Sequence, residues 1–132
     1  MRVADGRLPA LNVFGDDYPT PDGTAQRDYI HVVDVADGHV DALDHVDDEP
    51  GMQVFNLGTG VGTSVLELSA AFAKASGRDI PHLVQPRRAG DVATLIADPG
   101  KVASAWGWHA TRGLDDMCRD AWRFQVENPL GY

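Results

Sequence analysis

The sequence has 132 residues, with 20 Asp and Glu against 11 Lys and Arg and a formal net charge of −9 at pH 7, and its length and composition fit one globular domain. A chain this acidic repels phosphate backbones and anionic membrane surfaces, and it has no basic patch to outweigh that background, so we expect neither nucleic acid nor a membrane as a partner. The single cysteine, Cys118, and the absence of an apolar leader in the first residues favour a reducing, cytoplasmic setting.

The first part of the chain is predicted to hold two extended segments and one helix. Residues 8–14 alternate well enough for a short strand, and the Gly-, Pro- and Asp-rich run that follows is a loop. Residues 28–33 favour an extended segment that leads into a helix. In this helix Ala36, Val40 and Leu43 recur at helical spacing and form the expected apolar face. The breakers Glu49, Pro50 and Gly51 should follow its end.

The middle of the chain predicts a strand, a glycine-rich turn and a helix. Residues 54–58 (VFNLG) have little polarity on either face, which is typical of a strand buried on both sides. After the turn, Ser64 and Glu67 have the spacing of a capping box, and a helix over 65–76 follows. Gly77 stands where helices commonly end on glycine.

The last part predicts one strand and two helices. A strand covers 80–84, and residues 85–91 form a loop with adjacent arginines. Asp98 and Pro99 are typical of an N-cap and first turn of a helix that reaches about Trp106. A final helix covers 114–126. Strands and helices therefore interleave, and residues 1–132 are predicted to be one mixed α/β unit.

The glycine-rich turn at 58–63 invites a nucleotide-loop interpretation, because a helix N-terminus suits phosphate. The spacing fails that test, since Thr63 stands where a dinucleotide fingerprint needs its third glycine and no Walker lysine follows. We expect a structural turn that lets strand and helix pack closely.

Other catalytic and metal patterns are absent. The five histidines have no metalloenzyme spacing. The acidic run that includes Asp41, Asp44, Asp47, Asp48 and Glu49 lacks calcium-loop spacing, so a solvated helix flank is the favoured interpretation. No serine lies in a nucleophile elbow. We therefore expect no metal and no hydrolase chemistry.

Three loop arginines, Arg27, Arg87 and Arg88, stand out in this acidic chain. A guanidinium suits a diphosphate, whereas ion pairs with Asp28 or Asp91 are the structural alternative and are slightly favoured by spacing. Phe14 could offer a ring to a nucleobase or simply pack in the core. Asp91 could accept hydrogen bonds from ribose hydroxyls or merely end a loop.

Several blocks in the right order resemble the C-terminal part of UDP-glucose 4-epimerases, which are extended short-chain dehydrogenases/reductases. The blocks are VFGDDYPTPDGTAQRDYIHVVDVADGHVDAL, VFNLGTGVGTSVLEL, PRRAGDVA and LDDMCRDAWRFQVENPLGY, and together they cover nearly all of the chain from Leu8. The resemblance implies an α/β fold that is the substrate-binding part of such an enzyme, with the Rossmann domain largely missing.

The resemblance also implies the site. The uracil contacts of the family fall on Asn12, Val13 and Phe14, its diphosphate contacts on Arg27 and Arg88, and its ribose contact on Asp91. Leu95 replaces a tyrosine that bacterial members often carry near the sugar, which widens the pocket and leaves the choice between a hexose and its N-acetylated relative open.

The family's NAD chemistry has no counterpart in these residues. Members oxidise the sugar's 4-hydroxyl onto NAD and return the hydride to the other face, with a Tyr-x-x-x-Lys pair as acid and base. The lysines here are Lys74 and Lys101, and no tyrosine has lysine four residues on. We expect a chain that binds UDP-glucose or UDP-galactose. It lacks catalytic and NAD-binding residues, so we expect it to be inactive alone. We also expect the family's homodimer interface to be missing. The alternatives are a stand-alone UDP-sugar-binding module and part of a related nucleotide-sugar dehydratase or decarboxylase.

Overall fold

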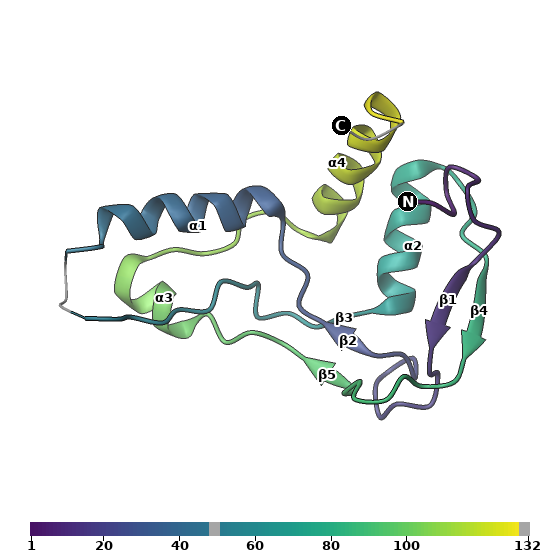
Figure 1. Ribbon diagram of the computed structural model, residues 1–132, viewed down its shortest axis with the longest axis horizontal. Coiled ribbons are helices and arrows are strands. Elements are labelled where there is room, and N and C mark those ends of the chain that lie inside the picture. The colour runs from purple at the N-terminus through teal and green to yellow at the C-terminus, as the bar shows by residue number, and fades with distance from the viewer. Residues whose placement is uncertain (48–50, 130–132) are drawn as a thin grey trace.

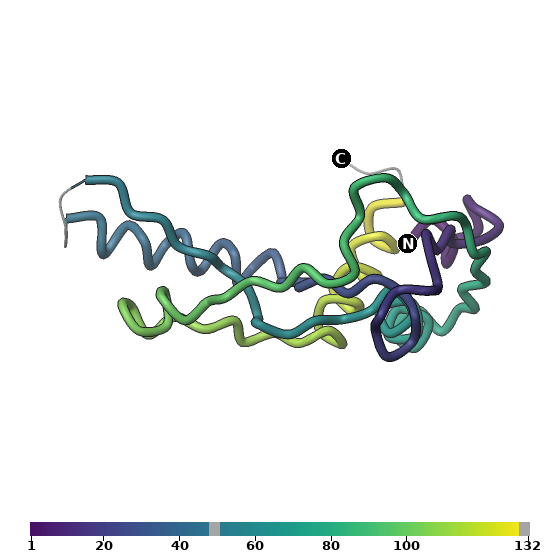
Figure 2. The backbone as a smooth tube through the Cα atoms, turned by 90° about the horizontal axis from the view of Figure 1, so that it is seen from below, coloured from purple at the N-terminus to yellow at the C-terminus, as the bar shows by residue number. Residues whose placement is uncertain are grey.

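The computed structural model describes residues 1–47 and 51–129, and the molecule is elongated (Figure 1). The helices α1 (Val32–Asp44) and α3 (Gly100–Trp106) lie at one end, and the helices α2 (Val65–Ser76) and α4 (Leu114–Glu127) lie towards the other. Extended segments run along the length of the molecule between these ends, as the backbone trace also shows (Figure 2). The predicted mixed α/β class is confirmed.

Two small sheets lie at the end that carries α2. In the first, β1 (Leu11–Phe14) pairs in parallel with β4 (His82–Gln85). In the second, the order is β3 (Thr63–Ser64), β2 (Gln26–Arg27) and β5 (Thr94–Leu95), so that β2 is central. The strands predicted at 8–14 and 80–84 exist but begin later, after Pro9 and Pro81, because proline has no N–H to donate to a strand ladder. β2, β3 and β5 were not predicted, since two-residue strands carry no periodicity.

The hydrophobic core forms where α2 packs against α4. The observed bounds of α2 equal the predicted ones, its Ser64–Glu67 capping box is present, and Gly77 ends it with a φ of 64°. The aromatic rings of Phe72 and Trp122 meet edge to face across the two helices, with centroids 6.2 Å apart. The buried and half-buried core residues are Ala4, Leu68, Ala71, Phe72, Ala75, Ile80, Leu114, Cys118, Ala121 and Trp122.

Helix α1 corrects one prediction. Its expected apolar face is open to solvent, with Val40 60% and Leu43 71% exposed, and the side that is buried carries Asp34 and Gly38. The reason is that no helix or strand of the described chain covers the valine face, whereas Gly38 lies against Leu57 and Trp108. The helix ends at Asp44, and Glu49 and Pro50 lie outside the described residues.

The segment 54–58 corrects a second prediction, because it runs without a strand partner and is not buried on both sides. Val54 is 65% exposed, and only Gly58 of this segment is buried. A β-strand exists only when a neighbouring strand accepts its hydrogen bonds, and no described residues supply one here.

Helix α3 begins one residue later than predicted, with Pro99 as its N-cap. The Asp98 carboxylate still accepts a hydrogen bond from the Gly100 N–H at 2.9 Å.

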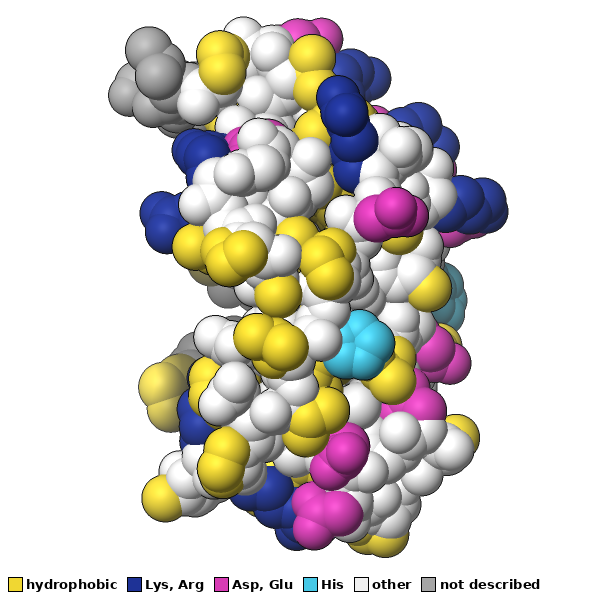
Figure 3. Space-filling view, turned by 90° about the vertical axis from the view of Figure 1, so that its right-hand side faces the viewer, with side chains coloured by type: hydrophobic (Ala, Val, Ile, Leu, Met, Phe, Trp, Pro, Cys, Tyr) yellow, Lys and Arg dark blue, Asp and Glu magenta, His cyan; other side chains and the backbone are white. Residues whose placement is uncertain are grey.

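The end of the molecule that carries β1 and β4 shows hydrophobic side chains spread between charged ones (Figure 3). Leu83 and Val84 of β4 are 56% and 51% exposed. Because successive side chains of a strand point to opposite faces, β4 is open to solvent on both of its faces.

Candidate functional site

Two of the three loop arginines converge on one carboxylate. The Arg88 Nε lies 3.0 Å from Asp91 Oδ2, and an Arg27 terminal nitrogen lies 3.9 Å from Asp91 Oδ1. Arg27 also donates to the backbone oxygens of Gln26 and Val92, at 2.7 and 2.9 Å. Asp91 is about one quarter exposed, so the two positive charges meet at a surface that solutes can reach.

Phe14 lies beside this group. The Arg88 guanidinium carbon sits 4.5 Å from the centre of the Phe14 ring, a cation–π distance. Phe14 ends β1, next to Val13, whose side chain is 1% exposed and anchors the strand. Asn12 is exposed, and its side-chain oxygen accepts from Gln85 Nε2 at 3.5 Å.

Leu95 reaches the site through strand pairing. β5 is parallel to β2 in a register that places Leu95 opposite Arg27. Leu95 is 62% exposed. Of the seven residues predicted for the site, the structure brings Phe14, Arg27, Arg88 and Asp91 into contact, and it places Asn12, Val13 and Leu95 on the flanking strands.

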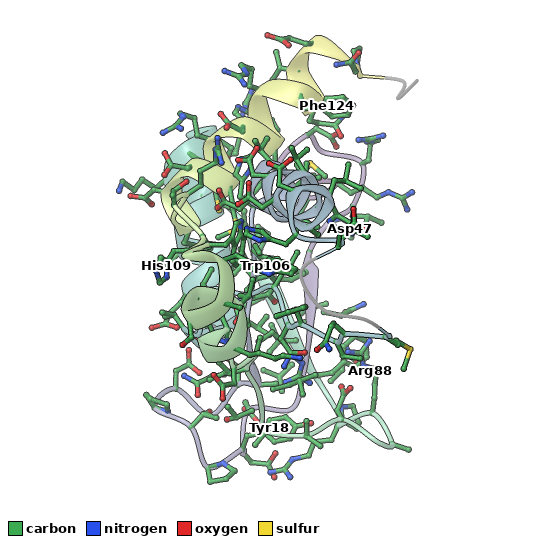
Figure 4. All side chains as sticks on the ribbon, turned by 90° about the vertical axis from the view of Figure 1, so that its left-hand side faces the viewer. Tyr18, Asp47, Arg88, Trp106, His109 and Phe124 are labelled. Carbon is green, nitrogen blue, oxygen red and sulfur yellow. The ribbon has the colours of Figure 1, made fainter. Side chains whose placement is uncertain are left out.

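Arg87, the third loop arginine, contacts Tyr18 and Asp17 rather than Asp91. Its guanidinium lies 4.0 Å from the centre of the Tyr18 ring, and its Nε donates to Asp17 at 2.6 Å. Arg88 and Tyr18 both lie in the lower part of the view in Figure 4, but Arg87 and Arg88 contact different rings, those of Tyr18 and Phe14. The ion pairs offered as an alternative for Arg27 and Arg88 are present with Asp91, not with Asp28.

Asp28 instead binds the glycine-rich turn. Its carboxylate accepts from the N–H groups of Thr59, Gly60 and Ala97, at 3.0 to 3.3 Å, and from the Thr59 hydroxyl. A phosphate at this turn would need the free N–H groups of the turn, but those of Thr59 and Gly60 are bound to Asp28, and the N-terminus of α2 is closed by Ser64 and Glu67. The turn therefore does not fit NAD phosphates, and its role is structural.

A buried carboxylate, Asp34, was not foreseen from the sequence. Asp34, 2% exposed, accepts from the N–H groups of Thr111 and Arg112, the Thr111 hydroxyl and the Arg112 guanidinium. Burial alone would raise the pKa of Asp34, but these hydrogen bonds outweigh it and the pKa lies below the ordinary value. The sequence could not predict that Asp34 is buried and bound, because its partners Thr111 and Arg112 are 77 and 78 residues away.

Residues 1–47 and 51–129 hold neither a metal-binding cluster nor a membrane-spanning helix. No group of three or more His, Cys, Asp or Glu side chains is placed to hold a metal ion there. No described helix has both the length and the apolar character needed to cross a membrane. Asp48 and Glu49 of the acidic run lie outside the described residues.

Comparison with known proteins identifies what the chain is similar to. Residues 1–58 match the model of the NAD dependent epimerase/dehydratase family. The UDP-glucose 4-epimerase of Bacillus subtilis is 55% identical over 99% of this chain, and that of Homo sapiens is 53% identical over 99%. The resemblance to UDP-glucose 4-epimerases is confirmed. The chain spans about two fifths of the length of these relatives, 39% and 38%.

Solved structures agree with the fold. The UDP-glucose 4-epimerase of Bifidobacterium longum, in complex with NAD+ and UDP, superposes with a TM-score of 0.93 and 50% identity over 99% of this chain and 39% of that one. The UDP-Glc/GlcNAc 4-epimerase of Campylobacter jejuni has a TM-score of 0.85 and 40% identity, covering 96% of this chain and 38% of that one.

Proposed function

We propose that this chain is the C-terminal, UDP-sugar-binding part of a UDP-glucose 4-epimerase that works in galactose metabolism in the cytoplasm. One observation carries the proposal: Arg27 and Arg88, from segments about sixty residues apart, meet at Asp91 beside Phe14. This group combines the chemistry that a nucleoside diphosphate requires, namely two cations, one hydroxyl acceptor and one ring. The whole of residues 1–132 serves as this binding unit.

In this proposal the residues have separate tasks. The uracil packs against Phe14 and the β1 backbone at Asn12 and Val13. The ribose hydroxyls donate to Asp91, the diphosphate accepts from Arg27 and Arg88, and Leu95 faces the sugar. The ion pairs with Asp91 are weak, because Arg88 is 62% exposed and Arg27 lies 3.9 Å from the carboxylate. A surface ion pair is worth about 0–1 kcal/mol, whereas a charge-assisted hydrogen bond is worth about 1.5–3 kcal/mol.

NAD and the acid–base pair belong to the part of the relatives that this chain does not span. Two facts support this: the glycine-rich turn has its N–H groups bound to Asp28, and neither Lys74 nor Lys101 follows a tyrosine at the required spacing. We expect the relatives' homodimer contacts to lie in that part too. Bound NAD would supply hydride transfer at the sugar's C4, while the residues here bind and orient the nucleotide sugar.

The test is calorimetric titration of the chain with UDP at pH 7. The wild type should bind, and Arg27→Ala or Arg88→Ala should each weaken binding about tenfold or more, since about 1.4 kcal/mol is one decade in Kd. Arg87→Ala is the matched control, because Arg87 is bound to Asp17 and Tyr18, and it should change Kd less than about twofold. No heat from the wild type with millimolar UDP would contradict the proposal.

A stand-alone UDP-sugar-binding module is the second candidate, favoured only by the absence of the acid–base pair from the sequence. Turnover of UDP-galactose with NAD separates the two. The chain alone should show none above background. If a separately produced polypeptide holding the rest of the Bacillus subtilis relative restores turnover on mixing, the chain is part of an epimerase. UDP binding without such restoration favours the module.

A further inference from the structure

The strand that carries Arg27 is held by little backbone pairing. β2 has two residues, and each neighbour, β3 and β5, also has two. Gln26 N–H donates to Ala93 O at 2.8 Å, and Asp28 N–H donates to Leu95 O at 3.1 Å. A pairing this short orders few residues, so it holds a side chain poorly unless other contacts add to it.

The Asp28 side chain supplies those contacts at the end of all three strands. Its carboxylate binds the Thr59 and Gly60 N–H groups at 3.0 Å each, on the turn that leads into β3. It also binds the Ala97 N–H at 3.3 Å, two residues after β5. One side chain therefore joins β2 to both neighbouring segments, directly after Arg27.

The turn and the segment after β5 pack closely around Asp28. A Cβ built on Gly58 would lie 2.7 Å from Asp28 Oδ2 and 2.5 Å from Ala97 Cβ, so the turn and the segment after β5 close tightly over the carboxylate. Both of its oxygens accept hydrogen bonds from N–H groups. A change to either oxygen is therefore transmitted to the backbone on both sides of β2.

We infer that Asp28 is a positioning residue of the nucleotide site: by joining the 59–60 turn and Ala97 to β2, it fixes Arg27 and the opposite Leu95 where the diphosphate and sugar bind. The inference rests on the proposed function for its ligand. Asp28 itself does not touch the ligand. Arg27 needs this support because its bond to Gln26 O is local, whereas its bond to Val92 O depends on the alignment of β2 with the segment that leads into β5.

Asp28→Asn is the main variant, and Asp34→Asn is its matched control. Asn keeps the shape of Asp but turns one acceptor oxygen into an NH2 donor that faces N–H groups. Asp34 likewise binds a distant loop through backbone N–H groups and a threonine hydroxyl, with the Arg112 guanidinium in addition, so its variant loses the same kind of contact away from the site. Thr59→Val is a milder second variant that removes one hydroxyl bond to Asp28 and keeps the carboxylate.

UDP affinity and amide hydrogen exchange are measured below the unfolding temperature of each variant. Asp28→Asn should weaken UDP binding at least tenfold and Thr59→Val two- to fivefold, while Asp34→Asn changes Kd less than twofold. Without UDP, Asp28→Asn should speed hydrogen exchange of the backbone amides of residues 26 and 28 at least tenfold. Asp34→Asn should leave the exchange rates of these two amides unchanged.

The outcomes separate the two proposals. If the wild type does not bind UDP, the proposed function fails, and the exchange data alone decide whether Asp28 holds β2. If the wild type binds but Asp28→Asn binds equally well, or if Asp34→Asn weakens binding as much, the positioning role of Asp28 is wrong. Exchange of the Gln26 and Asp28 amides that does not respond to Asp28→Asn would also overturn it.

Discussion

Gly58 is the residue whose small size has the clearest consequence. It is buried, and any side chain there would meet Ala97 and the Asp28 carboxylate. The sequence showed a glycine-rich turn and ruled out the known phosphate loops, but it gave no reason for each glycine. The reason is that the turn packs against Asp28 and Ala97. Asp28 binds Thr59 and Ala97, which lie 31 and 69 residues further along the chain, and no local sequence pattern records such contacts.

Replacing Gly58 by Ala should destabilise the folded chain by about 1–3 kcal/mol, the usual cost of overpacking a tight contact. The free energy of unfolding is measured by urea titration. Ala97→Gly removes the Cβ that the new methyl group would meet at 2.5 Å, so the double variant should recover part of the loss beyond additivity. Strictly additive effects would show that this contact is not the cause.

At the scale of elements, the predictions succeeded where local chemistry decides the outcome. α2 has its cap, its apolar stripe and its terminal glycine within its own sequence, and its bounds were predicted to the residue. α1 and the segment 54–58 depend on neighbours, and here the predictions of a covered face and a buried strand failed. Likewise the arginines were singled out from composition, but only the fold shows that Arg88 meets Asp91 and Arg87 turns to Asp17.

The hydrogen bonds of Asp34, which join α1 to Thr111 and Arg112 before α4, should make the folded chain less stable at acid pH. The pKa of Asp34 is lowered in the folded state, so its contribution is complete above the ordinary aspartate pKa of about 4 and is lost as the pH falls through the lower folded value. We expect Asp34→Asn to cost about 1–3 kcal/mol at pH 7, because buried donors lose their acceptor, and clearly less near pH 2.

Chemical denaturation at several pH values measures this difference. Asp37→Asn is the control: it lies on the same helix and is also bound by the Arg112 guanidinium, at 3.1 Å, but it is 57% exposed, so its loss should stay below about 1 kcal/mol. A cost for Asp34→Asn that does not change between pH 7 and pH 2 would contradict the linkage.

At the scale of the whole molecule, apolar surface is left uncovered on one side of α1. Val32, Val40 and Leu43 are 76%, 60% and 71% exposed, and Val54 of the unpaired segment is 65% exposed. Contiguous exposed apolar surface favours association, and an unpaired extended segment can pair with another chain. The relatives are more than twice as long as this chain, and we propose that their additional residues cover this side.

We therefore expect the chain to self-associate at micromolar concentration or to unfold over a broad range of temperature. Light scattering should give a mass above that of a monomer, and Val40→Lys with Leu43→Lys should shift it towards the monomer. Val61→Lys with Val126→Lys adds the same charge at sites that are 62% and 60% exposed but off this helix, and it should not have that effect. A monomeric wild type with a sharp thermal transition would show the expectation to be wrong.

The pairing of β2 with β5 also sets when the site can exist. Gln26 and Thr94 are strand partners 68 residues apart, and Arg27 is separated from Asp91 by almost as many residues. Closing so long a loop costs entropy before any contact compensates for it, and such non-local pairings slow folding. During synthesis Arg27 emerges long before its cross-sheet contacts Asp91, Val92 and Leu95, so nucleotide recognition is among the last properties that the nascent polypeptide acquires.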